Sequence, residues 1–453
     1  AILAVSPLAS TTITNAGVIQ AKTAIDASWR TVVNNTGTVA GDVLMGSSSI
    51  FNNQAGGNLY SGLQFQGDLN NGGVLNPGGP NAFLMTRITG ALNNTGIYRP
   101  DLDFSNHRSD FVSVSGASTF AGTVRPVLHN PVKNIWLGIA HFDTQQTSVP
   151  VADSDTPLFH YLLKNNGPQA WRDPLISVDA DFTPSAFALS EDRANIARSL
   201  QELWNRGDAS IGPAFDKLTH IQTQDQYRDA LNSIAHDGQF ARASNQMQAS
   251  YASMNRMMSC PGFVGESTIL REGDCTWARL EANWIARDTT ADDEGYRIHQ
   301  KTVTIGAQRE VSRNWFLGGA LSYAYGETTS SSDMSNHSDT FSGGLALKYN
   351  RTPWQAAVAV YGGVEQSRMS RSTLDGVAKS TPKSSFLASR LRLAYEFSQP
   401  SWYLRPYVDL DVNHIRQSGY QEEGSSLFDL KVHGNDTTSF MVSPMLEIGG
   451  RRN

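Results

Sequence analysis

Residues Leu387 to Phe397, with the sequence LASRLRLAYEF, decide the fold of this chain. Most apolar side chains fall at alternate positions, and small or charged side chains, including Arg390 and Arg392, fall between them. Successive side chains of a β-strand point to opposite faces, so this stretch predicts a strand with one apolar and one charged face. A strand of about ten residues with this alternation is typical of an outer-membrane β-barrel.

The same alternation recurs about eight times between Cys275 and the end of the sequence. In the segment Leu404 to Asn413, Asp409 and Asp411 lie on the polar face. A continuous face of Arg, Glu and Asp suits a hydrated lumen, where opposite charges neutralise each other. A soluble barrel would also alternate, but aromatic residues concentrate near the strand ends, as two membrane interfaces require. We therefore predict an antiparallel transmembrane β-barrel over residues 275–453.

Composition agrees with extended β structure. The 453 residues include 39 glycines and only 17% charged residues, and no apolar run is long enough for a membrane helix. The net charge of −6 offers no basic field for nucleic acid, which we exclude as a partner. We expect no enzyme centre and no cofactor, because nucleophile elbows, zinc-protease helices and phosphate loops are absent from the sequence. We expect no metal site, because the sequence has only two thiols and no close His pair.

An Asn-then-Gly turn followed by an apolar residue repeats along the N-terminal part. It occurs at Asn15-Ala16-Gly17-Val18, Asn35-Thr36-Gly37-Thr38-Val39, Asn71-Gly72-Gly73-Val74 and Asn94-Thr95-Gly96-Ile97. The spacing is about twenty residues or a multiple of it, the length of a solenoid rung, and Gly and Asn accept the left-handed backbone of a tight corner. A β-sandwich with Asn-Gly turns is the alternative. We predict a right-handed parallel β-helix over residues 1–108, with terminal rungs over 109–183 that cap its open edge.

Residues 184–258 change to a helical pattern. Ser190 is expected to cap the first helix, and Thr223 with Gln226 forms a capping box for a later one. The last helix, Gln239 to Met258, consists mainly of Ala, Ser, Asn, Gln and Met and has no strong apolar stripe. A wet, narrow lumen would suit such a helix, so we predict a helical linker that ends in a pore helix.

The order of these parts resembles the type V secretion family, the monomeric autotransporters, over essentially the whole chain. Asp110 to Gly116 with Gly122 resembles the autochaperone segment of a passenger. Ala230 to Ile234 resembles the linker before the barrel, and Cys275 to Arg279 resembles the first strand of the translocator domain. The resemblance implies a twelve-stranded barrel with an aromatic last residue. Since about eight strands are present and Asn453 is not aromatic, we expect both ends to be cut and the barrel to be unable to close.

The resemblance also implies that the pore helix stays in the lumen as tether and plug. Its arginines, Arg242 and Arg256, are expected either to pair with inward carboxylates or to face lumen water. The candidate carboxylates are Glu281, Asp409 and Asp411.

Two further features concern covalent chemistry. Some relatives cleave themselves at an asparagine of the pore helix, for which Asn245 and Asn255 are the candidates. The paired-Asn motif of those relatives is absent, so we expect no cleavage. Cys260 and Cys275 close a loop that a disulfide would stabilise by roughly 3 kcal/mol, with free thiols as the alternative.

These features together predict an autotransporter of the outer membrane that displays an adhesin-like passenger on the cell surface. Its expected partners are outer-membrane lipid, the barrel-assembly machinery and periplasmic chaperones, with a monomeric barrel. The alternative is the translocator of a secreted enzyme whose active site lies N-terminal to this chain. For that alternative, the nearest carboxylate cluster is Asp101, Asp103 and Asp110.

Overall fold

The computed structural model describes residues 1–4, 10–146, 148–167, 171–234, 238–258, 261–262, 271–290, 295–330, 334–399 and 401–450. The chain divides into two compact units, Ala1–Leu231 and Asn232–Asn453. The first is a β-solenoid followed by helices, and the second is a half-barrel of antiparallel strands with a helix packed against it. These architectures confirm the predicted fold class, while the finer boundaries at residues 108, 183 and 258 stay predictions.

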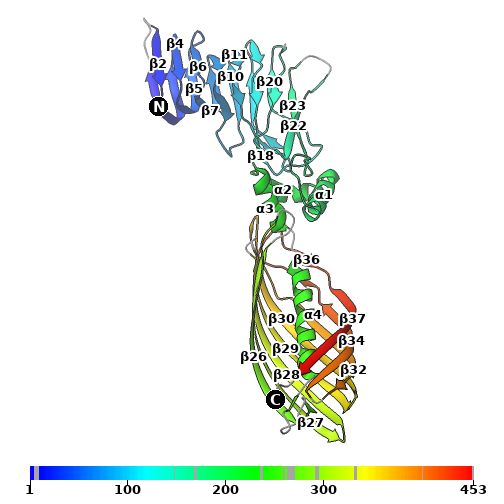
Figure 1. The fold of residues 1–453 in the computed structure, drawn as a ribbon. Coiled ribbons are helices and arrows are strands. Elements are labelled where there is room, and N and C mark those ends of the chain that lie inside the picture. Colours follow the sequence, from blue (N-terminus) through cyan, green and yellow to red (C-terminus); the bar gives the residue numbers. More distant parts are fainter. Residues whose placement is uncertain are drawn as a thin grey trace. The chain divides into compact units, whose positions relative to one another are not determined.

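Two parallel sheets run along the solenoid, and their strands stack rung upon rung (Figure 1). The larger sheet contains β1 (Ile2–Ala4), β3 (Val18–Ala27), β5 (Thr38–Met45), β7 (Asn58–Gln66), β9 (Val74–Pro77), β10 (Met85–Thr89), β12 (Ile97–Tyr98), β15 (Phe111–Val114), β17 (Thr123–Val124), β20 (Ala140–Phe142) and β21 (Val151–Ala152). The smaller sheet contains β2 (Thr11–Asn15), β4 (Thr31–Asn35), β6 (Ile50–Asn53), β8 (Asp68–Asn71), β11 (Leu92–Asn94) and β16 (Ser118–Phe120). A short third sheet joins β13 (Asp101–Asp103), β14 (Arg108–Ser109) and β18 (Val127–His129).

A column of five buried asparagines, the amide column, runs through the interior of the solenoid. Its members are Asn15, Asn35, Asn53, Asn71 and Asn94. Each side-chain nitrogen donates to the side-chain oxygen of the next member at 2.6–2.8 Å, across 18–23 residues of sequence. Backbone carbonyls at the corners accept further bonds from the same nitrogens. The column fixes the register of the rungs, because a slip of one residue would leave buried amides without partners.

Glycine is required at these corners for a different reason from the one predicted. A Cβ on Gly37 would lie 2.1 Å from the carbonyl oxygen of Gly17, and a Cβ on Gly96 would lie 2.3 Å from that of Gly73. Neither Gly37 nor Gly96 has a left-handed φ. Close approach of stacked corners, and not a left-handed backbone, therefore excludes larger residues there.

The amide column ends where Phe120 takes the position next to Asn94. Among the residues that the structure describes, the Asn94 amide nitrogen is buried without an acceptor. Tyr98 and Phe142 pack against Phe120, with ring centroids 5.5 and 5.3 Å away. The solenoid core therefore changes from hydrogen-bonded amides to aromatic packing toward the C-terminal rungs.

The neighbours Asn70 and Asn71 provide a matched test of the amide column. We expect Asn71→Ala to lower the free energy of unfolding of the solenoid by about 2–3 kcal/mol, because it removes two buried side-chain bonds, the one from Asn53 and the one that donates to the buried oxygen of Asn94. Asn70 bonds to Asn52 on the exposed side of the same strand, so Asn70→Ala should cost less than about 1 kcal/mol. Urea unfolding of both variants compares them, and equal losses would contradict a structural role for the column.

Helices and a small antiparallel sheet follow the solenoid. They are β19 (Leu137–Gly138), β22 (Phe159–Asn165), β23 (Pro174–Ala180), α1 (Glu191–Arg206), η1 (Ala209–Ile211), α2 (Gly212–Asp216) and α3 (Gln224–Ile234). An aromatic cluster of Phe159, Phe182, Trp204 and Phe215 forms their core. Within the part of the chain described above, no helix is both long and apolar enough to cross a membrane.

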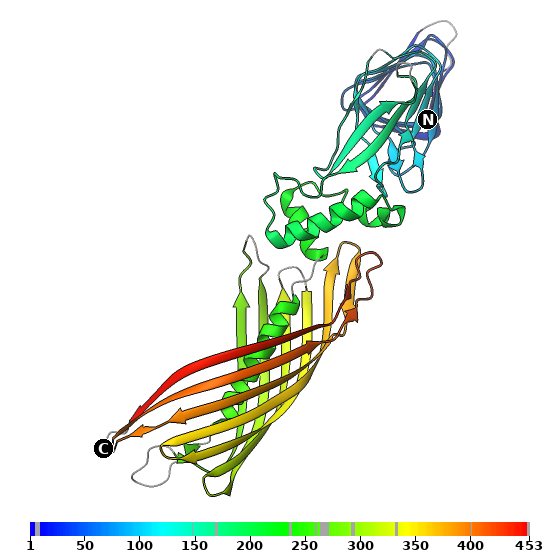
Figure 2. The same ribbon diagram turned by 90° about the vertical axis from the view of Figure 1, so that its right-hand side faces the viewer.

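The second unit contains eight long antiparallel strands. They are β26 (Cys275–Arg287), β27 (Tyr296–Ser312), β28 (Trp315–Ser330), β29 (Met334–Arg351), β30 (Trp354–Thr373), β32 (Lys383–Tyr395), β34 (Trp402–Gln417) and β37 (Asn435–Gly450). Shorter elements are β24 (Pro261–Gly262), β25 (Arg271–Glu272), β31 (Gly376–Ser380), β33 (Phe397–Ser398), β35 (Tyr420–Gln421) and β36 (Lys431–Val432). Over the described residues, β26 pairs only with β27 and β37 only with β34, so the sheet is open as expected. Figure 2 shows this curved sheet around helix α4 (Gly238–Met257).

The two faces of the sheet are those that the alternation predicts. On β32, the side chains of Leu387, Leu391 and Leu393 point away from α4 and are half exposed or more, whereas Arg390 is 3% exposed. An apolar outer surface of this kind is typical of a membrane β-barrel, and the buried arginine requires a partner inside.

Candidate functional site: the lumen and its helix

Helix α4 lies inside the curve of the half-barrel and contacts β28, β29, β30, β32 and β34. Met254 and Met257 pack on a patch of small side chains, which lets the helix approach the strands closely. These small residues are Ala320, Ala346, Ala357, Ala359 and Ala388. Gln246 donates to the Ser384 hydroxyl at 3.3 Å, and Tyr251 shares a hydrogen bond with Ser439 at 3.2 Å. The polar composition of α4 thus matches a partly polar, partly alanine-lined lumen.

The two ends of the half-barrel differ in their connections. At one end the strands are joined by short turns at residues 313–314, 352–353 and 396–401. At the other end the connections are unequal: β28 and β29 are only three residues apart in sequence, whereas residues 374–382 and 418–434 form longer connections. Outer-membrane barrels keep short turns on the periplasmic side and longer loops outside. The end with residues 418–434 is therefore the outer end.

Helix α4 runs from the outer end toward the periplasmic end. Gln246 contacts the start of β32, next to the loop of residues 374–382. Nine residues later, Asn255 contacts Arg390, farther along the same strand. The chain therefore enters the lumen from outside, descends through it as α4, and continues into the strands from the periplasmic side.

Aromatic side chains form a belt at the periplasmic end. Trp315 and Trp354 directly follow two of the short turns. Trp315 packs on Tyr349 with 5.1 Å between ring centroids, and Trp354 packs on Tyr395 at 4.9 Å. Aromatic rings at this level are typical of a membrane interface.

An ionic cluster of Arg390, Arg392, Asp409 and Asp411 lies on the lumen face of β32 and β34. Arg390 binds Asp411 through two hydrogen bonds of 2.6 and 2.9 Å. Arg392 binds Asp409 in the same way at 2.7 and 2.6 Å. Both arginines also donate to the side-chain oxygen of Asn255 on α4. The cluster therefore neutralises its own charge and holds the helix by an uncharged side chain.

The structure assigns different partners to the predicted pore residues. Arg256 pairs with Glu281, which also binds Arg279 at 3.0 Å. Asp409 and Asp411 are bound by Arg392 and Arg390 of the neighbouring strand β32. The side chains of Arg242 and Asn245 lie outside the described part of the structure.

A second ionic contact lies on the lumen face and was not predicted. Lys348, 4% exposed, donates to Glu272 at 2.7 Å, and Gln308 donates to the same carboxylate at 2.9 Å. Glu272 belongs to the segment between α4 and β26. Because Lys348 follows the alternation of β29, the sequence could have placed it on the lumen face. Its partner Glu272 lies in a connecting segment, and alternation does not predict such a partner.

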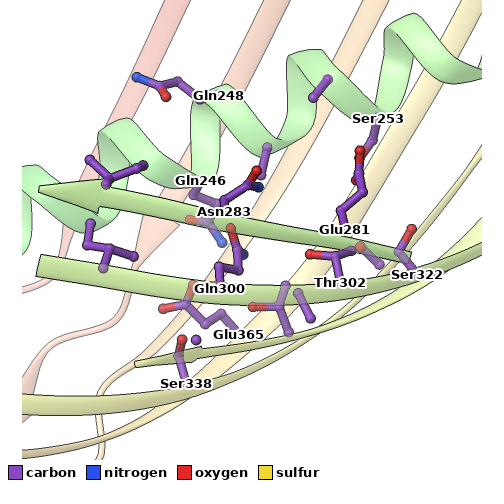
Figure 3. A pocket seen from close by; sticks show the side chains of 18 of the residues that line it. Gln246, Gln248, Ser253, Glu281, Asn283, Gln300, Thr302, Ser322, Ser338 and Glu365 are labelled. Carbon is purple, nitrogen blue, oxygen red and sulfur yellow. The ribbon is translucent and has the colours of Figure 1, made fainter. Parts of the chain in front are cut away.

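A cavity of about 400 Å³ separates α4 from the strands near β26 and β27. Figure 3 shows Gln246 and Ser253 of α4 on one side, facing Glu281, Asn283, Gln300 and Thr302 from these strands. Amides, hydroxyls and a carboxylate can all bind water, so the polar side of this cavity suits solvent, while Trp284 and Phe386 add apolar surface to its lining.

Several remaining candidates are placed as follows. Cys275 is disulfide-bonded, and Cys260 lies outside the described residues. The side-chain oxygen of Asn255 accepts hydrogen bonds from Arg390 and Arg392 of the ionic cluster. Over the described ranges, no group of three or more His, Cys, Asp or Glu side chains could hold a metal ion.

The aspartates considered for a passenger enzyme do lie together in the solenoid. Asp101 and Asp110 are fully buried, and Asp103 is 6% exposed. Their oxygens accept hydrogen bonds from backbone amides and from neighbouring side chains. They therefore brace the solenoid from inside and do not line an open site.

One family model and two solved structures match parts of this chain. The family model of the autotransporter beta-domain matches residues 276–451. Among solved structures, the translocator domain of autotransporter NalP from Neisseria meningitidis matches with 14% identity and a TM-score of 0.40, covering 48% of this chain and 73% of that one. The beta domain of the Bordetella autotransporter BrkA matches with 19% identity and a TM-score of 0.31, covering 40% and 72%. No curated protein sequence matches the chain. The beta-domain match lies over the half-barrel strands, so residues 276–451 form an autotransporter beta-domain.

Proposed function

We propose that residues Ala1–Leu231 belong to a passenger that is displayed outside the cell, and that α4 remains in the lumen as its tether. The direction of α4 carries this proposal, because the residues that precede the helix must leave the barrel at its outer end. Asn255 and Arg256 then hold the helix through the ionic cluster and Glu281. Outer-membrane lipid covers the apolar face of the strands, and periplasmic chaperones with the barrel-assembly machinery deliver the chain.

Protease added to intact cells tests the display of the passenger. We expect proteinase K to digest Ala1–Leu231 and to leave a protected fragment that contains α4 and the strands. The same treatment of lysed cells controls for the intrinsic resistance of the solenoid. Full protection of Ala1–Leu231 in intact cells, together with its digestion after lysis, would place the passenger in the periplasm and contradict the proposal.

The passenger is proposed to act as an adhesin. An outward column of Asn34, Asn52 and Asn70 repeats along one sheet, with bonds of 3.0 and 2.9 Å between neighbours. Parallel strands place such groups about 4.8 Å apart, so the sheet presents a regular hydrogen-bonding surface. Retention of expressing cells on host-cell monolayers is the measurement, with cells that express only Asn232–Asn453 as control. Equal retention of both would exclude this role for Ala1–Leu231.

A further inference from the structure

The loop of residues 78–84 connects β9 to β10 and is held by two buried carboxylates. The backbone N–H of Asn81 donates to Asp101 at 3.1 Å, and that of Leu84 donates to Asp110 at 2.7 Å. The two aspartates are also bonded to each other: the N–H of Asp101 donates to the Asp110 carboxylate at 2.8 Å, and the N–H of Asp110 donates to the backbone carbonyl of Asp101 at 2.8 Å. Loop and carboxylates therefore form one hydrogen-bonded unit.

His129 of β18 completes this unit. Its Nε2 lies 2.7 Å from Asp101, and its ring packs edge-on against Phe83 of the loop, with 5.6 Å between centroids. Asp101 and Asp110 are both 0% exposed, and the second oxygen of Asp101 is buried with no hydrogen-bond partner among the described residues. If both aspartates are ionised, a single imidazolium leaves one buried negative charge uncompensated. A proton on the pair removes that charge.

Among the residues that the structure describes, the other groups near the pair do not supply the missing positive charge. Asp103 of β13 and Asp216 of α2 face His129 and add further negative charge. Tyr98 of β12 is fully buried near Asp110. Arg108 of β14 stacks over Phe83 at 4.5 Å and is exposed.

We propose that Asp101, Asp110 and His129 form a proton-binding latch, which holds the loop of residues 78–84 in place and loosens when its protons leave. Burial is the largest influence on Asp110 and, with the nearby Asp101 charge, raises the pKa of Asp110 to about 7. The hydrogen bond to Asp101 raises the pKa of His129 above its ordinary value. Both groups therefore bind protons more tightly in the closed state than in the open one. The latch is strongest in acid and weakens as the pH rises from about 4 to beyond 7.

Hydrogen exchange of the full chain in detergent measures the latch directly. Between pH 5 and pH 8, after correction for intrinsic exchange, we expect opening of the loop of residues 78–84 to increase on the order of tenfold to a hundredfold. Asp110→Asn keeps an acceptor oxygen but cannot titrate, so its pH response should fall to a few-fold at most. Asp68→Asn is the matched control. Asp68 also accepts a backbone N–H from a neighbouring rung, that of Ala91 at 2.8 Å, but lies outside the latch, so its response should equal the wild type's.

Two results would overturn the latch. One is equal loop opening at pH 5 and pH 8 in the wild-type chain. The other is a full pH response in Asp110→Asn. If Asp110→Asn does not fold, His129→Gln decides, because loss of the imidazolium should raise loop opening at pH 5 by roughly tenfold. An unchanged opening in His129→Gln at pH 5 would then contradict the proposal.

Discussion

We expect Arg390→Leu to lower the free energy of unfolding of the half-barrel by about 3–5 kcal/mol. Arg390 is 3% exposed and binds Asp411, which is fully buried, through two hydrogen bonds. Its removal leaves the Asp411 carboxylate without its counter-ion and takes away one of the two arginines that donate to Asn255 on α4. Urea unfolding of the full chain in detergent measures this change in the free energy of unfolding. The fraction of folded protein is read from the gel band of the folded species.

Arg416→Leu is the control for Arg390→Leu. Arg416 lies on the adjacent strand β34 and is paired with Asp436, but its side chain is 72% exposed and the separation is 4.0 Å. An exposed pair contributes about 0–1 kcal/mol, so this variant should be close to wild type. Equal losses for the two variants would show that burial of the ionic cluster does not contribute to the stability of the half-barrel. Addition of Asp411→Leu to Arg390→Leu should recover part of the loss, because no buried charge is then left alone.

The second large effect is expected from Trp204→Ala in helix α1. Trp204 is 1% exposed, packs on Phe215 with 5.3 Å between ring centroids, and donates its indole N–H to Asp179 at 2.8 Å. Truncation of a buried aromatic residue leaves a cavity, so we expect a loss of about 3–5 kcal/mol in the stability of this region. Pulse proteolysis across a urea series, with cleavage in α1–α3 as the signal, measures it.

Trp29→Ala controls for the loss of a tryptophan from the same unit. Trp29 is half exposed on the solenoid, so its removal should change stability by less than about 0.5 kcal/mol. If helices α1–α3 resist cleavage equally well in Trp204→Ala and in Trp29→Ala, the aromatic cluster does not stabilise these helices. Trp204→Phe should lie between the two, because it fills most of the volume but cannot reach Asp179.

The sequence predicts local features of this fold well where one rule dominates. Alternation assigns Arg390 to the lumen and Leu391 to the outside, because the strand period is two. Thr223 and Gln226 form the expected capping box, with both reciprocal bonds at 3.2 Å. Ser190 is different: α1 begins after it, but its side chain makes no capping bond. The prediction of a side-chain cap there was wrong, and acidic residues fill the first turn instead.

Pairing across long sequence distances could not be predicted in the same way. Arg256 meets Glu281, while Asp411 meets Arg390, and both choices depend on strand register and on the depth of α4 in the lumen. The two-residue period of a strand reveals which face a charge occupies but not which charge lies opposite. Strand length was also underestimated, since β30 has 20 residues, about twice what the membrane requires. The excess lies beyond the apolar band, where alternation is weaker.

The amide column makes the rungs of the solenoid interchangeable. Asn53 and Asn71 occupy the same place in successive rungs, 18 residues apart, and make the same bonds to their neighbours. Loss of residues 54–71 would bring Asn53 next to Gly72, where Asn71 now stands, and would leave the column shorter but unbroken. Duplication of the same segment would lengthen the column, again without a break. Passengers of this construction can therefore change their reach by whole rungs during evolution, whereas a gain or loss of half a rung would destroy the register of everything after it.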